Sequence, residues 1–178
     1  MSLRLYPLGQ SLHQNLSMFS IKLGQTVAWL TVLMAIVVAL IVALRVVVQV
    51  GSVGAQESVT YMHAIVIMCA SAFTLAQNGH VRVDIFYRSF TSEQRAWVNL
   101  MGSALFLLPL AVFIVMISWN YMLSSWSVHE TSADAGGIPA VFLLKTLIPL
   151  NGVLLFIQCI ADIIRNLLIV SFKDPQHA

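Results

Sequence analysis

The chain has few charged side chains. Of its 178 residues only 9% are Asp, Glu, Lys or Arg, whereas 59% are hydrophobic. A soluble domain carries about 25% charged residues and uses them to cover its surface, so the composition argues against an ordinary water-soluble fold. It also argues against intrinsic disorder, which needs low hydrophobicity and high charge. What remains is a chain whose solvent is mostly lipid.

Other absences narrow the range of functions. The net charge of +2 is too small to indicate a nucleic-acid partner. Cys69 and Cys159 lie far apart in apolar runs, so they form no CxxC pair and no disulfide framework, and they leave the redox compartment open. The sequence has no Walker motif, nucleophile elbow, zinc-binding spacing or dinucleotide fingerprint. It therefore predicts no enzyme, no metal site and no cofactor.

Long hydrophobic runs, in contrast, are abundant. The first charge-free run, Leu23 to Leu44, would form a helix of about 33 Å, enough to cross a hydrocarbon core of about 30 Å. The runs are apolar on all sides and do not alternate, which favours membrane helices over surface helices or a β-barrel. We expect an all-α integral membrane protein that forms a single domain over 1–178. Its four transmembrane helices are expected at about 23–48, 57–77, 94–122 and 139–168.

Basic residues gather on one side of these predicted spans. They are Arg4, Lys22, Arg82, Arg88, Arg95, Arg165 and Lys173. The loop between spans three and four has no Lys or Arg and contains Glu130 and Asp134. The positive-inside rule therefore predicts that both termini are cytoplasmic.

The segment Gly79 to Phe90, between spans two and three, is amphipathic. Its apolar residues recur at helical spacing, and Arg82 and Asp84 lie elsewhere around the helix. We expect a short interfacial helix with its basic side toward anionic headgroups, and a plain loop is the alternative. Thr91 followed by Gln94 predicts a capping box at the start of the third span.

No carboxylate lies in the middle of a predicted span. Glu57 is at the start of the second span, and Asp162 is near the cytoplasmic end of the fourth. A proton site must change charge within the membrane, so this absence argues against a self-sufficient proton-coupled carrier. No solute-sized polar site is expected either. A self-contained channel or small exporter is one alternative function.

The main alternative is a membrane-anchor or haem-bearing subunit of a redox complex. Haem would need two histidines at one depth of the bundle. His63 and His129 are both on the predicted outer side, whereas His80 is on the opposite side. The simpler interpretation of His63 is a hydrogen bond within the bundle.

Lys145 is unusual because it lies inside the fourth predicted span, about 9 Å along the helix. A lysine at this depth can extend to the outer headgroups. Alternatively it pairs with Glu130, Asp134 or Glu57, or with an acidic group of a partner. Arg45 and Glu57 bracket the first outer loop and are a further candidate pair, although surface pairs contribute little stability.

Small residues and prolines predict how the helices pack. The four-residue repeats are Ala35, Ala39 and Ala43 in the first span, and Ala64, Met68, Ala72 and Ala76 in the second. This spacing lets helix backbones approach closely, either within the chain or against a partner. Pro109 and Pro149 predict kinks in spans three and four. Residues 1–22 are expected to lie along the membrane.

Several short motifs, in order, resemble one transporter family. The run Gly79-His80-Val81-Arg82-Val83-Asp84 resembles the G-H-x-R-V-D segment of the DctQ-like small permease subunit of tripartite ATP-independent periplasmic (TRAP) transporters. The runs Glu130-Thr131-Ser132, Gly136-Gly137-Ile138-Pro139, Lys145, Ile148-Pro149-Leu150 and Gln158 are similar to its E-x-S, G-G-x-P, K, I-P-x and Q pattern. The resemblance covers about Arg45 to Arg165. Asn151 departs from it, since a glycine is common there and Gly152 follows one place later.

The resemblance implies one part of a larger machine. In that family a periplasmic binding protein captures a solute, usually a carboxylate. A large membrane subunit then carries solute and sodium by an elevator-like movement, and the small subunit enlarges its fixed scaffold. The expected partners are therefore the large TRAP permease subunit, the periplasmic solute-binding protein and membrane lipids, in a bacterial inner membrane.

The resemblance and the charge pattern together select candidate site residues. Those expected to contact a partner or lipid, or to be structural, are Arg45, Glu57, Arg82, Asp84, Glu130 and Lys145. The outer loop and Lys145 would lie where the binding protein docks or where lipid meets both subunits. Sodium would be used by the partner subunit, and this chain would have no cofactor.

Overall fold

The computed structural model describes residues 2–80, 87 and 89–172 of the chain. Its elements are α1 (Ser2–Val47), α2 (Val53–Ala76), α4 (Ser92–Gly102), the π-helical turn η1 (Ser103–Leu107), α5 (Leu108–Ser127) and α6 (Val141–Phe172). Because α4, η1 and α5 follow one another without a break, the described residues form 4 helices that are long and apolar enough to cross a membrane. The predicted all-helical architecture with four spans is confirmed for this part of the chain.

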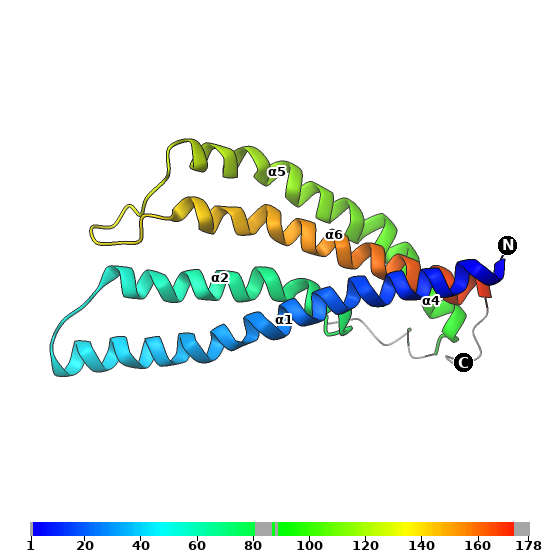
Figure 1. Cartoon of the computed structure of the whole chain (residues 1–178), viewed down its shortest axis with the longest axis horizontal. Coiled ribbons are helices and arrows are strands. Elements are labelled where there is room, and N and C mark those ends of the chain that lie inside the picture. Colours follow the sequence, from blue (N-terminus) through cyan, green and yellow to red (C-terminus); the bar gives the residue numbers. More distant parts are fainter. Residues whose placement is uncertain (1, 81–86, 88, 173–178) are drawn as a thin grey trace.

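The helices form an elongated bundle in which the chain runs up and down (Figure 1). Helices α2 and α6 lie side by side in the middle, and α1 and α5 flank them. We call the end with the loops 48–52 and 128–140 the outer end, and the end where α1 begins and α6 ends the inner end. The cytoplasmic side of the inner end stays a prediction from the basic residues.

Helix α1 is longer than expected and corrects the prediction for residues 1–22. With 46 residues it extends for about 69 Å, so from Ser2 onward the chain already belongs to the same helix as the span. Its first turns pack along the end of α6. His13 Nδ1 donates a hydrogen bond to the carbonyl of Ala161 at 3.0 Å. Ser20, further along α1, is buried. The N-terminal part is therefore a packed helix of the bundle.

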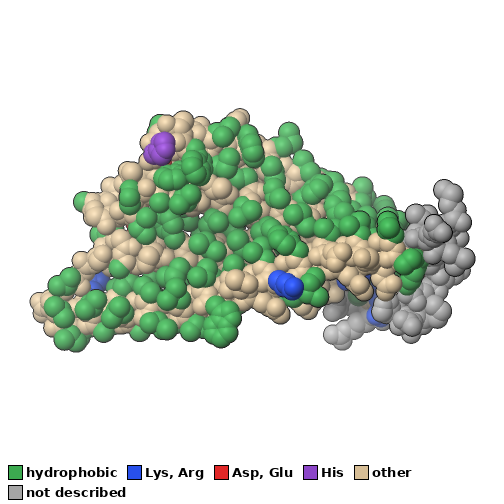
Figure 2. All heavy atoms as spheres, viewed as in Figure 1, with side chains coloured by type: hydrophobic (Ala, Val, Ile, Leu, Met, Phe, Trp, Pro, Cys, Tyr) green, Lys and Arg blue, Asp and Glu red, His purple; other side chains and the backbone are tan. Residues whose placement is uncertain are grey.

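Helix α6 is the central helix. It contacts α1, α2, α4 and α5. In its most apolar window 33% of the residues are buried, compared with 6% in that of α1. The apolar core joins Val27 of α1, Cys69 and Ala72 of α2, and Leu154 of α6. Most other apolar side chains face outward, which suits a lipid solvent, and Figure 2 shows them spread over the whole visible face.

The two predicted small-residue stripes have different locations. On α2, Ala72 is fully buried and the rest of its stripe is partly buried, so this stripe packs within the chain. On α1 the alanines at 35, 39 and 43 are exposed, and the packed side carries Val27 instead. Helix α1 comes very close to α2 at Gly24, where an added Cβ would collide with the side chain of Phe73. Gly24 thus permits the crossing of these helices.

Two predictions about the third span have physical explanations in the structure. The capping box is confirmed: the Thr91 hydroxyl accepts from the N–H of Gln94, and the Thr91 N–H donates to Oε1 of Gln94 at 2.9 Å. The π-helical turn Ser103–Leu107 directly precedes Pro109. Proline lacks an N–H and collides with the carbonyl four residues back, so a widened turn accommodates it.

The predicted interfacial helix, with Arg82 and Asp84, falls mainly on residues 81–86 and 88. These residues lie outside the described part of the chain. The interfacial helix and the roles of Arg82 and Asp84 therefore stay predictions.

Candidate functional site

At the outer end, the loop after α5 is fastened to α2 by one carboxylate. Glu57 lies in the first turns of α2. Its Oε1 accepts a short hydrogen bond from the hydroxyl of Ser132, and its Oε2 accepts from the N–H of Ile138 at 2.5 Å. Because these two groups lie on either side of the loop's turn, Glu57 holds the turn from both sides.

The glycine pair in this loop is required by the same contact. Gly136 has a φ of +81°, a conformation that other residues rarely adopt. A Cβ on Gly137 would lie 2.7 Å from Oε1 of Glu57 and 2.5 Å from Cβ of Ser132. Only glycine therefore leaves room for the carboxylate to meet the loop.

The same loop is fastened to α6 by an ion pair. Lys145 Nζ lies 2.5 Å from Oε2 of Glu130, and it also lies 4.1 Å from the centre of the Tyr121 ring. The backbone N–H of Val141 donates to the carbonyl of Glu130 at 3.0 Å. The hydrogen bond from Lys145 lowers the pKa of Glu130 from its ordinary value of 4.5. Of its three candidate acidic partners in this chain, Lys145 therefore pairs with Glu130.

Aromatic residues complete this end of the bundle. Trp126 Nε1 donates to the hydroxyl of Thr146 at 2.8 Å. The Trp126 ring meets that of Phe142 edge to face, with centres 4.7 Å apart. These contacts join the last turns of α5 to the first turns of α6.

The residues that fasten the loop 128–140 to α2 and α6 are Glu57, Glu130, Ser132, Ile138 and Lys145. We call them the outer brace.

Arg45 is not part of the outer brace. It is exposed near the end of α1. Within the described residues, the ion pairs join Lys145 to Glu130 and Arg165 to Asp162, so the candidate pair of Arg45 with Glu57 is absent. Glu57 binds the loop instead, because the loop presents a hydroxyl and a backbone N–H at hydrogen-bond distance.

Deeper in the bundle, neutral polar groups join the helices. Ser71 of α2 donates to Oδ1 of Asn151 of α6 at 2.5 Å. Gln158, fully buried, donates to the hydroxyl of Ser17 and to Oδ1 of Asp162, each at 3.4 Å. Asn151, Gln158 and Asp162 lie along α6, and we call them with Ser17 and Ser71 the inner seam. Asn151, which departs from the family pattern, therefore forms a hydrogen bond between two helices.

Gly152, the glycine that follows Asn151, has a packing role. A Cβ there would lie 3.0 Å from the carbonyl oxygen of Ala111 on α5, and Ala111 is fully buried. The shifted glycine thus provides the close approach of α5 to α6.

The inner end contains a polar cavity that the sequence analysis did not predict. Its volume is about 440 Å³, and it lies between the end of α2, the start of α4 and the end of α6. Arg95 and Arg165 both line it. The expectation of no solute-sized polar site is therefore wrong for this end. The sequence concealed the cavity because its residues come from two stretches, 78–99 and 165–169, which are more than 60 positions apart and which only the fold brings together.

The histidines considered as haem ligands lie on the surface. His63 is exposed on α2 and makes no hydrogen bond among the described residues, so the simpler interpretation, a hydrogen bond within the bundle, is wrong. His129 is exposed too, and its ring packs against that of Phe142 with centres 5.8 Å apart. Across the described residues, no group of 3 or more His, Cys, Asp or Glu side chains is placed to hold a metal ion.

Comparison with known proteins gives one match. The sequence model of the family described as "Tripartite ATP-independent periplasmic transporters, DctQ component" matches residues 13–168. No curated protein and no solved structure matches the chain.

Proposed function

The chain belongs to the DctQ component family of TRAP transporters, and from this premise we propose that it is the small membrane subunit of a sodium-coupled secondary transporter that depends on a binding protein. The solute is an organic molecule, most simply a carboxylate. The large TRAP permease subunit and a periplasmic solute-binding protein are the partners. The complex resides in a bacterial inner membrane. The family match over residues 13–168 is the observation that carries this proposal.

The subunit supports transport and does not bind the solute. Among the described residues, the carboxylates of the spans lie toward helix ends: Glu57 near the start of α2 and Glu93 in the first turn of α4. Asp162 lies about 32 Å along α6 from Val141, beyond a hydrocarbon core of about 30 Å. A coupling ion needs an ionisable or oxygen-rich site that changes occupancy within the membrane, and these positions argue for such a site in the partner.

The bundle suits a fixed scaffold. The outer brace holds the loop 128–140 to α2 and α6, and the inner seam holds α6 to α1 and α2. A rigid body of this kind gives a moving transport domain something to move against, and its breadth resists tilting in lipid. The braced loop is the surface that we assign to the docked binding protein or to lipid at the subunit boundary.

Uptake in cells tests the proposal. Cells that lack this chain but retain the large subunit and binding protein of the same operon should lose solute uptake, and expression of the chain should restore it. The chain should also co-purify with a tagged large subunit. Normal uptake without the chain, or purification of the large subunit free of it, would contradict the proposal.

Charge reversal tests the docking surface separately. Glu130→Lys and Lys145→Glu should each reduce uptake while the two membrane subunits still co-purify. The double reversal, which restores an opposite-charge pair, should recover part of it. Unchanged uptake in both single variants would remove the docking assignment and leave the subunit assignment intact.

A further inference from the structure

The polar cavity at the inner end has the lining of an anion site. Arg95 and Asn99 come from the first turns of α4, and Arg165 and Asn166 from the end of α6. Asn78 lies just past the end of α2. Guanidinium groups donate five N–H bonds and accept none, and amides add further donors. The cavity therefore combines two guanidinium groups and several amides with the apolar side chains of Ala96 and Ile169.

Arg165 has hydrogen-bonding capacity to spare. Its side chain is 29% exposed, and its Nη2 lies 3.6 Å from Oδ1 of Asp162, which is an ion pair beyond the usual hydrogen-bond distance. Within the described residues no other partner of its guanidinium is present, so its N–H groups are available to a ligand or to water. Because Asp162 is buried and also accepts from Gln158, it fixes where the charge of Arg165 lies.

Arg95 is positioned by an aromatic ring. Its guanidinium carbon lies 5.4 Å from the centre of the Tyr87 ring, within the range of a cation–π contact. The Tyr87 hydroxyl accepts a hydrogen bond from Nδ2 of Asn99 at 2.9 Å. Tyr87 thus fixes two of the cavity's donor side chains at once, and such fixing lowers the entropic cost of binding a ligand.

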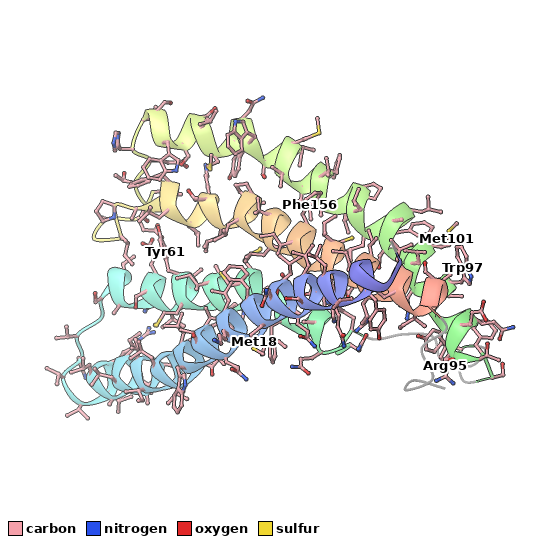
Figure 3. The ribbon with its side chains drawn as sticks, turned by 45° about the vertical axis from the view of Figure 1, so that its right-hand side comes forward. Met18, Tyr61, Arg95, Trp97, Met101 and Phe156 are labelled. Atoms are coloured by element: carbon pink, nitrogen blue, oxygen red, sulfur yellow. The ribbon has the colours of Figure 1, made fainter. Side chains whose placement is uncertain are left out.

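The cavity lies at the ends of two candidate membrane spans, where α2 has ended and α4 begins. Ile169 of α6 adds an apolar wall. Further along α4, Trp97 is 48% exposed and Met101 is 49% exposed. Figure 3 shows Arg95, Trp97 and Met101 on this helix at the inner end. Tryptophan is enriched at the headgroup level of membranes, so α4 presents apolar side chains to lipid next to the basic cavity.

We propose that this inner cavity binds the phosphate ester of an anionic phospholipid of the inner leaflet. Arg165 and Arg95 meet the phosphate oxygens, Asn99 and Asn166 line the headgroup, and the acyl chains lie beside Trp97 and Met101. Basic pockets between membrane helices on the cytoplasmic side are suited to such headgroups. A volume of about 440 Å³ is large enough for a glycerophosphate group. A lipid bound here would join α4 to α6 and fix the inner end within the bilayer.

Native mass spectrometry of the full chain tests this proposal. The delipidated chain in detergent is titrated with dioleoylphosphatidylglycerol and, separately, with dioleoylphosphatidylcholine. The wild-type chain should retain phosphatidylglycerol more tightly. The double variant Arg95→Gln/Arg165→Gln should lose about tenfold in apparent affinity, since charge-assisted contacts to phosphate are the strong ones. Arg45→Gln removes the same charge at the outer end and should leave affinity unchanged.

A second double variant distinguishes a loss of binding from a loss of folding. Arg95→Lys/Arg165→Lys keeps both charges and should retain more phosphatidylglycerol than the glutamine pair, with helicity by circular dichroism matched among all variants. Equal phosphatidylglycerol affinity in the wild-type chain and the glutamine pair would overturn the proposal.

Two further measurements distinguish a phospholipid from other anions that the cavity could bind. Inorganic phosphate that binds with the same arginine dependence, while phosphatidylglycerol does not bind, would assign the cavity to a free anion and overturn the lipid. Loss of co-purification with the large subunit in the glutamine pair, with phosphatidylglycerol affinity unchanged, would assign the cavity to an acidic group of that partner.

Discussion

The outer end and the interior of this bundle are held together by different chemistry. At the outer end, the carboxylates of Glu57 and Glu130 hold the largely exposed loop 128–140 to α2 and α6. Deeper in the bundle, the amides of Asn151 and Gln158 join one helix to another. Burial of an unpaired charge costs far more than burial of an amide that keeps its hydrogen bonds. Apart from Asp162, which is buried and pairs with Arg165, charged contacts therefore occur at the exposed end and neutral polar contacts in the interior.

The comparison indicates a different role for the outer brace and for the inner seam. Charged contacts at the outer end fix the shape of a loop without adding much stability, because solvent screens them. The inner seam and the close crossings of small residues determine whether the helices associate at all. Substitutions at the inner seam should therefore change stability, and substitutions at the outer brace should change local order and docking.

The largest effect is expected at the crossing of α1 and α2. Gly24→Ala places a Cβ against the side chain of Phe73 and should destabilise the chain by about 2 kcal/mol, measured by denaturation in detergent. Gly102→Ala is the matched control, since nothing lies within 4 Å of its Cβ and alanine favours a helix. Equal stability of the two variants would show that the crossing is not tight.

A smaller loss is expected within the inner seam. Asn151→Leu removes the hydrogen bond to Ser71 and should cost about 1 kcal/mol, as interhelical hydrogen bonds in membranes do. A double-mutant cycle with Ser71→Ala measures the coupling. Additive losses in the cycle would contradict a direct contact between these two side chains.

At the outer brace the expected change is local. Glu57→Gln keeps one acceptor oxygen for the N–H of Ile138 but removes the charge. The charge-assisted hydrogen bond from Ser132 is then replaced by a weaker one in which the hydroxyl must accept. Amide hydrogen exchange of residues 132–138 should become several times faster, while the denaturation midpoint changes little. Glu93→Gln, a carboxylate in the first turn of α4, is the control. Unchanged exchange would show that Glu57 does not hold the loop.

The smallest effect is a pH dependence of the Glu130 contact. Since Lys145 lowers the pKa of Glu130, folding favours the charged form, and the contact is fully present above the ordinary value of 4.5. It is lost as pH falls through the lowered pKa. The rate of amide hydrogen exchange in the loop, corrected for its intrinsic pH dependence, should therefore rise as the pH falls through the lowered pKa. Glu130→Gln should reduce that rise, and the remainder comes from protonation of Glu57, which holds the same loop. An undiminished rise in this variant would assign it to groups other than Glu130.

The sequence predicted the helices well because long apolar runs allow few other structures in lipid. For Lys145 it left two alternatives open, extension to the headgroups or an acidic partner such as Glu130, and the structure shows the pair with Glu130. It gave the wrong location for residues 1–22, since their scattered leucines and aromatics suit a membrane surface as well as the flank of α6. The exposed alanine stripe of α1 shows the same limit, because spacing does not specify which side of a helix is covered.

Sites assembled from distant segments were the hardest to predict. Asn78, Arg95 and Arg165 are far apart in the chain and have no common motif, so only the fold shows that they share a cavity. Glu57 has no signal in sequence that separates a contact with Arg45 from one with Ser132. The distinction depends on which group the outer loop brings within hydrogen-bond distance.

Reconstitution tests the central claim most directly. Proteoliposomes with this chain, the large subunit and the binding protein should accumulate an organic acid when an inward sodium gradient is imposed, with the acid chosen by its thermal stabilisation of the binding protein. Proteoliposomes with this chain alone should accumulate none. Accumulation of the same acid against its gradient by the chain alone would contradict its role as a scaffold subunit.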